Sequence, residues 1–256
     1  MKAQLTVLGS GTSMGVPTIG CDCRVCTSGD ARDRRTRPSV MLEYGGHVVL
    51  IDTTPDFREQ AIRERIRRLD AVLYTHSHAD HILGLDDLRP LSFRRDGGIP
   101  LYAHAHTIPT LKRMFQYVFE NDYKFGGIAK VALQEIDGPF DLFGARVQPI
   151  PIIHGEQEIH GYRLGSMAYL TDHSEIPAAS MEMLRGLDVL FLDALRHRPH
   201  PTHSTVQNSV RLAEELGAKR TFLTHICHDL PHEETNATLP PNVRLAQDGL
   251  RLEFEI

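Results

Sequence analysis

Four potential metal ligands lie within six residues of this chain. Residues 75–81 read THSHADH and follow the short apolar run AVLYT. In an extended segment alternate side chains point the same way, so His76 and His78 face one side, and coiling of the chain beyond them presents Asp80 and His81 to a second point. One cation cannot use all four ligands comfortably, whereas two cations about 3.5 to 4 Å apart can. The motif therefore predicts a two-metal site, because an exposed histidine cluster needs no strand before it.

This HxHxDH pattern at a strand-to-helix turn resembles the hallmark of the metallo-β-lactamase superfamily. The resemblance implies an α/β fold, the αββα sandwich, in which two mixed β-sheets are flanked by helices. It also implies three more ligands, and each has a candidate after an apolar run: His154 in PIIHG, Asp172 in YLTD and His225 in LTHICHD. Taken singly, either histidine could be a core residue and Asp172 a turn residue. Their order along the chain favours the ligand interpretation.

By the same resemblance, each of the two metals is expected to take three ligands of its own, and a seventh ligand is expected to be shared by both. The first metal is assigned to His76, His78 and His154, the second to Asp80, His81 and His225, and Asp172 is expected to bridge them. Asp80 is also expected to take part in catalysis. Nitrogen and oxygen ligands suit Zn²⁺, Mn²⁺ or iron, and Mn²⁺ or Zn²⁺ is the expected pair. Water shared by two dications becomes hydroxide near neutral pH, which makes a bridging hydroxide the expected nucleophile.

A second metal site is predicted from three cysteines. Cys21, Cys23 and Cys26 give CxCxxC spacing, one ligand short of a closed structural zinc site, and His228 is the candidate for the fourth ligand. Reduced, redox-active thiols are the alternative. Cys227 is expected to point elsewhere. The opening GSGTSMGVPTIGCDCRVC, with THSHADHILGLDDLRP, THST and THICHD, resembles PhnP-type phosphodiesterases of carbon-phosphorus lyase pathways over nearly the whole chain, and that resemblance implies a Cys₃His zinc site.

One histidine outside the ligand set is expected to act on the substrate. His203, in HPTHST, resembles the histidine that faces the substrate in phosphodiesterase branches of the superfamily, so it is the candidate general acid or phosphate ligand. His200 competes for the role, and Asp193, which ends the run DVLFLD, could orient a histidine from behind. The alternative is that His203 merely precedes a helix capped by Ser204 or Thr205.

The expected reaction is hydrolysis of small cyclic phosphodiesters, with 5-phosphoribosyl 1,2-cyclic phosphate as the candidate implied by the resemblance. A tRNA 3′-processing endonuclease would share the metal site, but a net charge of -5 and a pI of about 6.3 argue against a nucleic-acid partner. A β-lactamase would normally be exported. A non-hydrolytic protein of the PQQ-biosynthesis type could lack some of the metal ligands. In this chain all seven expected ligand positions hold residues that can bind a metal.

Composition adds expectations about organisation and location. A length of 256 residues, with 41% apolar and 24% charged residues, predicts one globular domain over residues 1–256. The opening MKAQLTVLGSG lacks a signal-peptide pattern and no apolar run approaches ~18 residues, so a cytoplasmic location without membrane contact is expected. Four cysteines are too few for a disulfide framework. A homodimer is suggested by analogy.

Hydrophobic periodicity predicts the elements that must position these residues. Strands are expected at 4–8, 39–52 (a hairpin turning at Gly45-Gly46), 71–75, 101–103, 131–136, 146–153, 162–164, 167–170, 188–193 and 221–224. Helices are expected at 56–69, 81–88 (stopped by Pro90), 107–119, 177–185 and 204–216. The irregular stretch 91–127 is interpreted as an inserted loop near a substrate entrance, and GSGTSMG as a turn bordering the active site. Most remaining histidines are expected at the surface or in loops: His47, His104, His106, His160, His173, His197 and His232.

Overall fold

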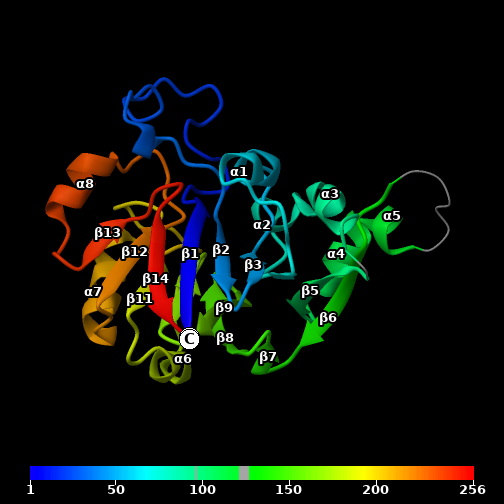
Figure 1. Ribbon diagram of the computed structural model, residues 1–256. Helices are drawn as coiled ribbons and strands as arrows, with labels where there is room; N and C mark the ends of the chain where they lie inside the picture. The colour runs from blue at the N-terminus through cyan, green and yellow to red at the C-terminus, as the bar shows by residue number, and fades with distance from the viewer. Residues whose placement is uncertain (96, 121–126) are drawn as a thin grey trace.

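Two seven-stranded β-sheets pack face to face in the computed structural model of this chain (Figure 1), in which residues 1–95, 97–120 and 127–256 are described. The first sheet contains β1 (Lys2–Gly9), β2 (Ser39–Tyr44), β3 (His47–Ile51), β4 (Ala71–Leu73), β5 (Ile99–His104), β6 (Val131–Ile136) and β14 (Arg251–Glu255). The second contains β7 (Phe140–Leu142), β8 (Ala145–His154), β9 (Gln157–Leu164), β10 (Met167–Leu170), β11 (Val189–Asp193), β12 (Arg220–Thr224) and β13 (Val243–Leu245).

Both sheets are mixed. Their strand orders are β14-β1-β2-β3-β4-β5-β6 and β13-β12-β11-β10-β9-β8-β7. Strands β3 to β6 run parallel in the first sheet and β10 to β13 in the second, while the other neighbours pair antiparallel. The carboxyl ends of parallel strands meet at one edge of a sheet, which is where ligand sites form in open α/β sheets.

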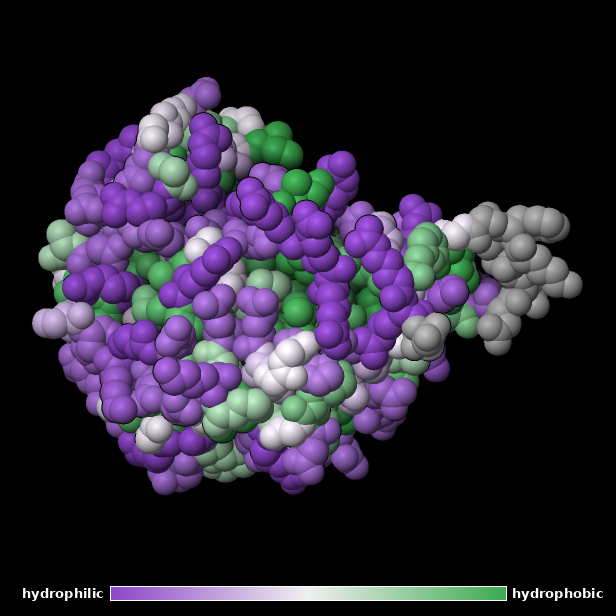
Figure 2. All heavy atoms as spheres, viewed as in Figure 1, coloured by the Kyte–Doolittle hydropathy of each residue, from purple (hydrophilic) through white to green (hydrophobic). Residues whose placement is uncertain are grey.

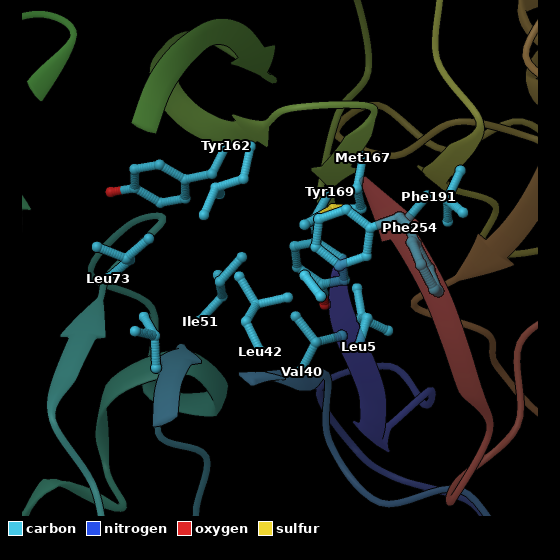
Figure 3. Close-up of a cluster of buried hydrophobic side chains, with 14 of the residues drawn as sticks. Leu5, Val40, Leu42, Ile51, Leu73, Tyr162, Met167, Tyr169, Phe191 and Phe254 are labelled. Carbon is cyan, nitrogen blue, oxygen red and sulfur yellow. The ribbon is translucent and has the colours of Figure 1, made fainter. Parts of the chain in front are cut away.

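The central core lies between the sheets. Leu5, Leu42 and Ile51 from the first sheet face Tyr169 and Phe191 from the second, as Figure 3 shows, and each of the five is fully buried. Successive side chains of a strand point to opposite faces. The other face of each sheet therefore also carries apolar residues that need a cover.

Helices provide that cover and complete the αββα sandwich (Figure 1). The first sheet is covered by α1 (Phe57–Arg63), α2 (Ala79–Ile82), η2 (Leu85–Leu88), α3 (Arg89–Ser92), α4 (Ile108–Met114) and α5 (Gln116–Phe119). The second is covered by α6 (Ala178–Met183) and α7 (Val206–Leu216), with η1 (Ala31–Asp33) and α8 (His232–Thr238) nearer the chain ends. The predicted fold class is thus confirmed.

Several predicted helices are shorter than expected. The helix predicted at 56–69 ends at Arg63, because Arg65 has a left-handed backbone conformation with φ 56°. Ile62, in the last turn of α1, is 61% exposed. The helix predicted at 81–88 begins at Ala79 and is interrupted after Ile82, and Pro90 lies in the first turn of α3 rather than beyond the last helix. A proline fits that first turn because its missing N–H would be unpaired there.

The described part of the stretch 91–127 is not one irregular loop. Its described residues form β5 inside the first sheet, followed by α4 and α5, which are separated at Phe115. Residues 96 and 121–126 lie outside the described part of the chain. The strands β7, β13 and β14 and the helix α8 were not predicted.

The face shown in Figure 2 is mostly hydrophilic, with apolar residues interspersed. The large exposed apolar side chains, such as Ile19, Met14 and Phe93, are scattered along the chain. None of the helices within the described ranges is long and apolar enough to cross a membrane.

Candidate metal centre

Three histidines from two segments meet at the carboxyl end of β4. His76 and His78 follow that strand, and His154 is the last residue of β8. One ring nitrogen from each lies within 4.8 Å of the others. Ring centroids are 4.6 Å apart for His76 and His78, and 5.0 Å apart for His78 and His154. The structure therefore brings together the three residues predicted to bind the first metal.

A second group lies beside the first and contains Asp80, His81, Asp172 and His225. His81 Nε2 lies 3.2 Å from one oxygen of Asp172, and His225 Nε2 lies 3.1 Å from the other. The rings of His76 and His81 are 4.1 Å apart, so the two groups adjoin. Asp172 groups with the second set of ligands rather than with the first three histidines, so its predicted bridging role stays a prediction.

Two ligands of the second group depart from ordinary backbone geometry. Asp172 and His225 each have φ 59°, and they lie two residues after β10 and one residue after β12. Asp52, at the end of β3, has φ 66°. Residues other than glycine rarely adopt this left-handed conformation, and such outliers concentrate at functional sites. A sharp turn at a strand end aims each side chain back toward the edge where the strands meet.

The protonation states of the first three histidines and of Asp172 suit cation binding. Burial lowers the pKa of His76 well below its ordinary value, and also lowers the pKa values of His78 and His154, so these imidazoles are neutral. Burial alone would raise the pKa of Asp172, but the neighbouring His225 and His81 hold it well below its ordinary value. Neutral imidazoles and ionised carboxylates are the forms that ligate metals.

Buried ring nitrogens point to the same fit. Nε2 of His76 is buried and lacks a hydrogen-bond partner among the described residues, and Nε2 of His81 is buried with carboxylate oxygens of Asp80 and Asp172 each 3.2 Å away. Buried polar atoms are normally paired, so an unpaired atom needs an explanation. Burial would lower the pKa of His81, but Asp80 and Asp172 raise it well above its ordinary value. A dication would replace the protons that these carboxylates stabilise, and the donor set therefore fits a dinuclear centre.

Hydrogen bonds to the other ring nitrogen hold two of the candidate ligand imidazoles in one orientation. Asp52 is fully buried and its Oδ2 lies 2.7 Å from Nδ1 of His81, while Thr75 donates to it through its backbone N–H and its hydroxyl, both at 2.8 Å. Nδ1 of His154 donates to the carbonyl of Thr202 at 2.8 Å. Such contacts select the tautomer that leaves Nε2 free for a metal. Sequence reasoning missed Asp52, although it ends an apolar strand as Asp172 does.

His203 lies against the second group without belonging to its predicted ligands. Its ring stacks on His225 at 4.6 Å, and its Nδ1 donates to Oδ2 of Asp193 at 2.8 Å. Asp193 is fully buried and also accepts the N–H of Ser204 at 3.0 Å. His200 is turned toward Thr202, whose N–H lies 3.4 Å from its Nδ1. Thr205 caps the N-terminus of α7. His203 therefore precedes a capped helix, as the alternative interpretation held, and also contacts Asp193.

The family model of the β-lactamase superfamily domain matches residues 47–226, which include all seven predicted ligands. The chain belongs to the metallo-β-lactamase superfamily. A solved structure described as a new diphosphatase from the PhnP family is 64% identical, with a TM-score of 0.94 over 99% of this chain and 98% of that one. Within the superfamily, the chain therefore belongs to the PhnP family.

Two further proteins are similar to this chain over most of its length. An octanoyltransferase of Porphyromonas gingivalis is 41% identical over 95% of this chain, but the chain spans only 50% of that relative's length. Zn²⁺-bound PqqB from Methylobacterium extorquens is 20% identical, with a TM-score of 0.79 over 97% of this chain and 99% of that one. At that identity the likeness shows the fold alone.

This superfamily member also carries the predicted cysteine cluster. Nδ1 of His228 lies 3.2 Å from the sulfur of Cys21, 3.6 Å from that of Cys23 and 3.4 Å from that of Cys26. All four ligand atoms lie within 4.8 Å of one another, and the cysteines form no disulfide. Cys227 is buried outside this group, as expected, and its sulfur accepts the N–H of Asp229. Three thiols and one imidazole suit tetrahedral Zn²⁺.

A buried arginine, paired with an aspartate of the same loop, connects the N-terminal loop to the segment that carries both His225 and His228. Arg35 is fully enclosed and pairs with Asp33 at 3.0 Å. Its guanidinium also donates to the carbonyls of Cys227 and Leu230 at 3.0 and 2.6 Å. The GSGTSMG turn runs alongside, where the N–H of Thr12 donates to the carbonyl of Ile226. This turn thus borders the ligand segment, as predicted.

Most of the remaining histidines were expected at the surface or in loops, but two lie buried within elements, His160 in β9 and His232 at the start of α8, and His173 is buried in the loop after β10. His173 follows Asp172, and neither of its ring nitrogens has a hydrogen-bond partner within the described ranges. His160 packs on His104 with ring centroids 4.5 Å apart. Apolar runs beside these histidines were assigned to strands, but their burial depends on packing between segments far apart in the sequence.

Proposed function

We propose that this chain is a metal-dependent phosphodiesterase, and that its substrates are small cyclic phosphodiesters, with 5-phosphoribosyl 1,2-cyclic phosphate as the first candidate. The observation that carries the proposal is the convergence of two adjoining ligand groups beside His203, a histidine that belongs to neither set of predicted ligands. The 64% sequence identity between this chain and a diphosphatase of the PhnP family supports hydrolysis at phosphorus.

The proposed ligand sets follow the two groups. His76, His78 and His154 would hold one cation and Asp80, His81 and His225 the other, and Asp172, which groups with the second set, would be shared by both. Two Mn²⁺ or Zn²⁺ ions would supply the positive charge that activates water and neutralises phosphoryl oxygens. A structural Zn²⁺ would occupy the site formed by the three cysteines and His228.

The protein's own groups have three tasks in this proposal. Asp52 and the carbonyl of Thr202 hold the rings of His81 and His154 in one orientation. Asp193 accepts from Nδ1 of His203, which leaves Nε2 as the atom that delivers a proton to the departing alkoxide. The surrounding burial keeps these groups in a poorly solvated pocket, where oriented dipoles act more strongly than in water.

Turnover of bis(p-nitrophenyl) phosphate tests the proposal. The purified protein is loaded with Mn²⁺ or Zn²⁺, its metal content is measured, and release of nitrophenolate is followed with and without a chelator. We expect turnover that the chelator abolishes and that Asp172→Asn reduces by at least about 100-fold, because a ligand carboxylate is lost. A fully loaded protein that hydrolyses neither this ester nor any small cyclic phosphodiester contradicts the proposal.

A second candidate is hydrolysis of a diphosphate linkage, favoured by the 64% identity to a protein described as a diphosphatase. A phosphate leaving group needs less protonation than an alkoxide. Comparing kcat/KM on a cyclic phosphodiester with that on a dinucleoside diphosphate separates the two reactions. Transfer-RNA cleavage is disfavoured by the net charge of -5, and a non-hydrolytic scaffold would show no turnover with either substrate.

A further inference from the structure

A cavity of about 410 Å³ opens beside the metal ligands. His76 and Ser77 line one side of it, and the turn before α4 and the start of β9 line the rest. The lining side chains that could meet a substrate are His106, Thr107, Thr110, Gln157 and Glu158. Because His76 belongs to both the cavity and the first ligand group, a phosphodiester held at that group can extend one substituent into the cavity.

The wall of this cavity is fixed relative to the ligands. The backbone N–H of His160 in β9 donates to the carbonyl of Thr75, one residue before His76, at 3.2 Å. The ring of His160 packs on that of His104, which in turn lies 5.1 Å from that of His106. The strand that carries Gln157 and Glu158 is thereby attached to the metal loop. A substituent in the cavity is held at a defined position from the reacting phosphorus.

The lining is polar but nearly without charge. Thr107 and Thr110 offer hydroxyls, Gln157 offers an amide and His106 an imidazole, whereas Glu158 is the one carboxylate among the described lining residues. No lysine or arginine of the described ranges contributes to the wall. Proteins that bind a phosphate normally present arginine, lysine or a row of backbone N–H groups to it. A second phosphate placed here would meet a carboxylate instead.

We infer that this cavity receives an uncharged, hydroxyl-bearing substituent of the substrate, of the sugar or nucleoside class, and that Glu158 disfavours a second phosphate at that end. The inference rests on the proposed phosphodiesterase function. Hydroxyls donate to a carboxylate and exchange hydrogen bonds with an amide, so Glu158 and Gln157 can both bind a sugar hydroxyl, whereas the charge of Glu158 repels an anion. A phosphoribosyl substrate must then direct its 5-phosphate away from this cavity.

Two esters that differ by one phosphate test the inference. Thymidine 5′-(p-nitrophenyl phosphate) carries a neutral nucleoside, and its 3′-phosphorylated form carries the same nucleoside with an added dianion, while both release nitrophenolate. We expect the metal-loaded protein to prefer the neutral ester in kcat/KM. Glu158→Gln should raise kcat/KM for the phosphorylated ester by about two- to five-fold, the range of one charge interaction at short distance in water. Glu158→Lys should raise it further.

Glu156 provides the matched control. It lies two residues away, is exposed and does not line the cavity, so Glu156→Gln should leave the preference unchanged. Turnover of both esters with a preference that neither Glu158 variant alters overturns the inference, and so does a preference that Glu156→Gln shifts equally. Loss of all turnover, including that of bis(p-nitrophenyl) phosphate by the metal-loaded protein, overturns the proposed function and this inference with it.

Discussion

Oδ2 of Asp52 lies 2.7 Å from Nδ1 of His81, and both side chains are fully buried. Asp52 comes from the end of β3 and His81 from α2, two segments joined by the parallel pairing of β3 with β4. The contact fixes which nitrogen of His81 faces the metal position. Asp52 is therefore assigned to positioning rather than to metal binding.

Replacing Asp52 by asparagine should weaken metal binding while the fold is kept. Asparagine matches the shape of aspartate and tolerates the left-handed backbone found here. The loss of a partner behind a metal-ligating histidine typically lowers affinity by about 10- to 100-fold. Metal titration by calorimetry measures the effect, and circular dichroism checks the fold. An Asp52→Asn protein that binds metal as tightly as the parent contradicts the positioning role.

His203→Ala should affect substrates according to their leaving groups. A general acid contributes about 10²- to 10⁴-fold when it protonates an alkoxide, and far less when the leaving group is a stable nitrophenolate. We expect a loss of at least about 100-fold in kcat on a phosphodiester with an alkyl leaving group and a much smaller loss on bis(p-nitrophenyl) phosphate. Equal losses on the two esters would assign His203 to phosphate binding instead.

The convergence of the candidate ligands could be predicted because they leave local signals, which the superfamily resemblance connects. The motif at 75–81 concentrates four ligands in six residues, and His154, Asp172 and His225 each end an apolar run. Asp52 also ends such a run, in HVVLID, but nothing near it in the sequence marks it as a partner of His81. Only the pairing of β3 with β4 brings it there.

Arg35 is a second residue whose role was hidden in the sequence. It belongs to the run RDRRTR, which reads as exposed, yet its side chain is fully buried. Its partners, the carbonyls of Cys227 and Leu230, lie more than 190 residues away. Two strands were also missed: β13, which has only three residues, and the edge strand β14, although its sequence RLEFE alternates polar and apolar residues as a half-buried strand does.

Cys23→Ser should remove zinc from the cysteine cluster and reduce the folding yield. Three remaining ligands bind Zn²⁺ more weakly than four, and the cluster joins the N-terminal loop to the segment that carries His225. We expect the zinc content to fall by about one ion per chain, a count based on one closed four-ligand site. Cys227→Ser is the matched control, since that thiol lies outside the cluster. Unchanged zinc content in Cys23→Ser rules out the assignment.

Asp70→Asn should destabilise the fold in a pH-dependent way. The buried carboxylate of Asp70 accepts the N–H of Val48 at 2.9 Å and contacts the guanidinium groups of Arg68 and Arg95 at 2.9 and 2.7 Å. Burial alone would raise the pKa of Asp70, but these three partners together hold it below its ordinary value. Hydrogen bonds to a charged group contribute about 1.5 to 3 kcal/mol, so the free energy of unfolding should fall by about 2 kcal/mol at pH 7.

A depressed pKa in the folded state means that Asp70 stabilises the protein fully above the unfolded pKa of about 3.9. This stabilisation is lost as the pH falls through the lower, folded pKa, because the carboxyl is then protonated in both states. Urea unfolding of the parent and of Asp70→Asn at a series of pH values measures the difference. It should be constant above roughly pH 5 and shrink at lower pH. A difference that stays the same down to the acid limit would show that packing of Asp70, rather than its charge, stabilises the fold.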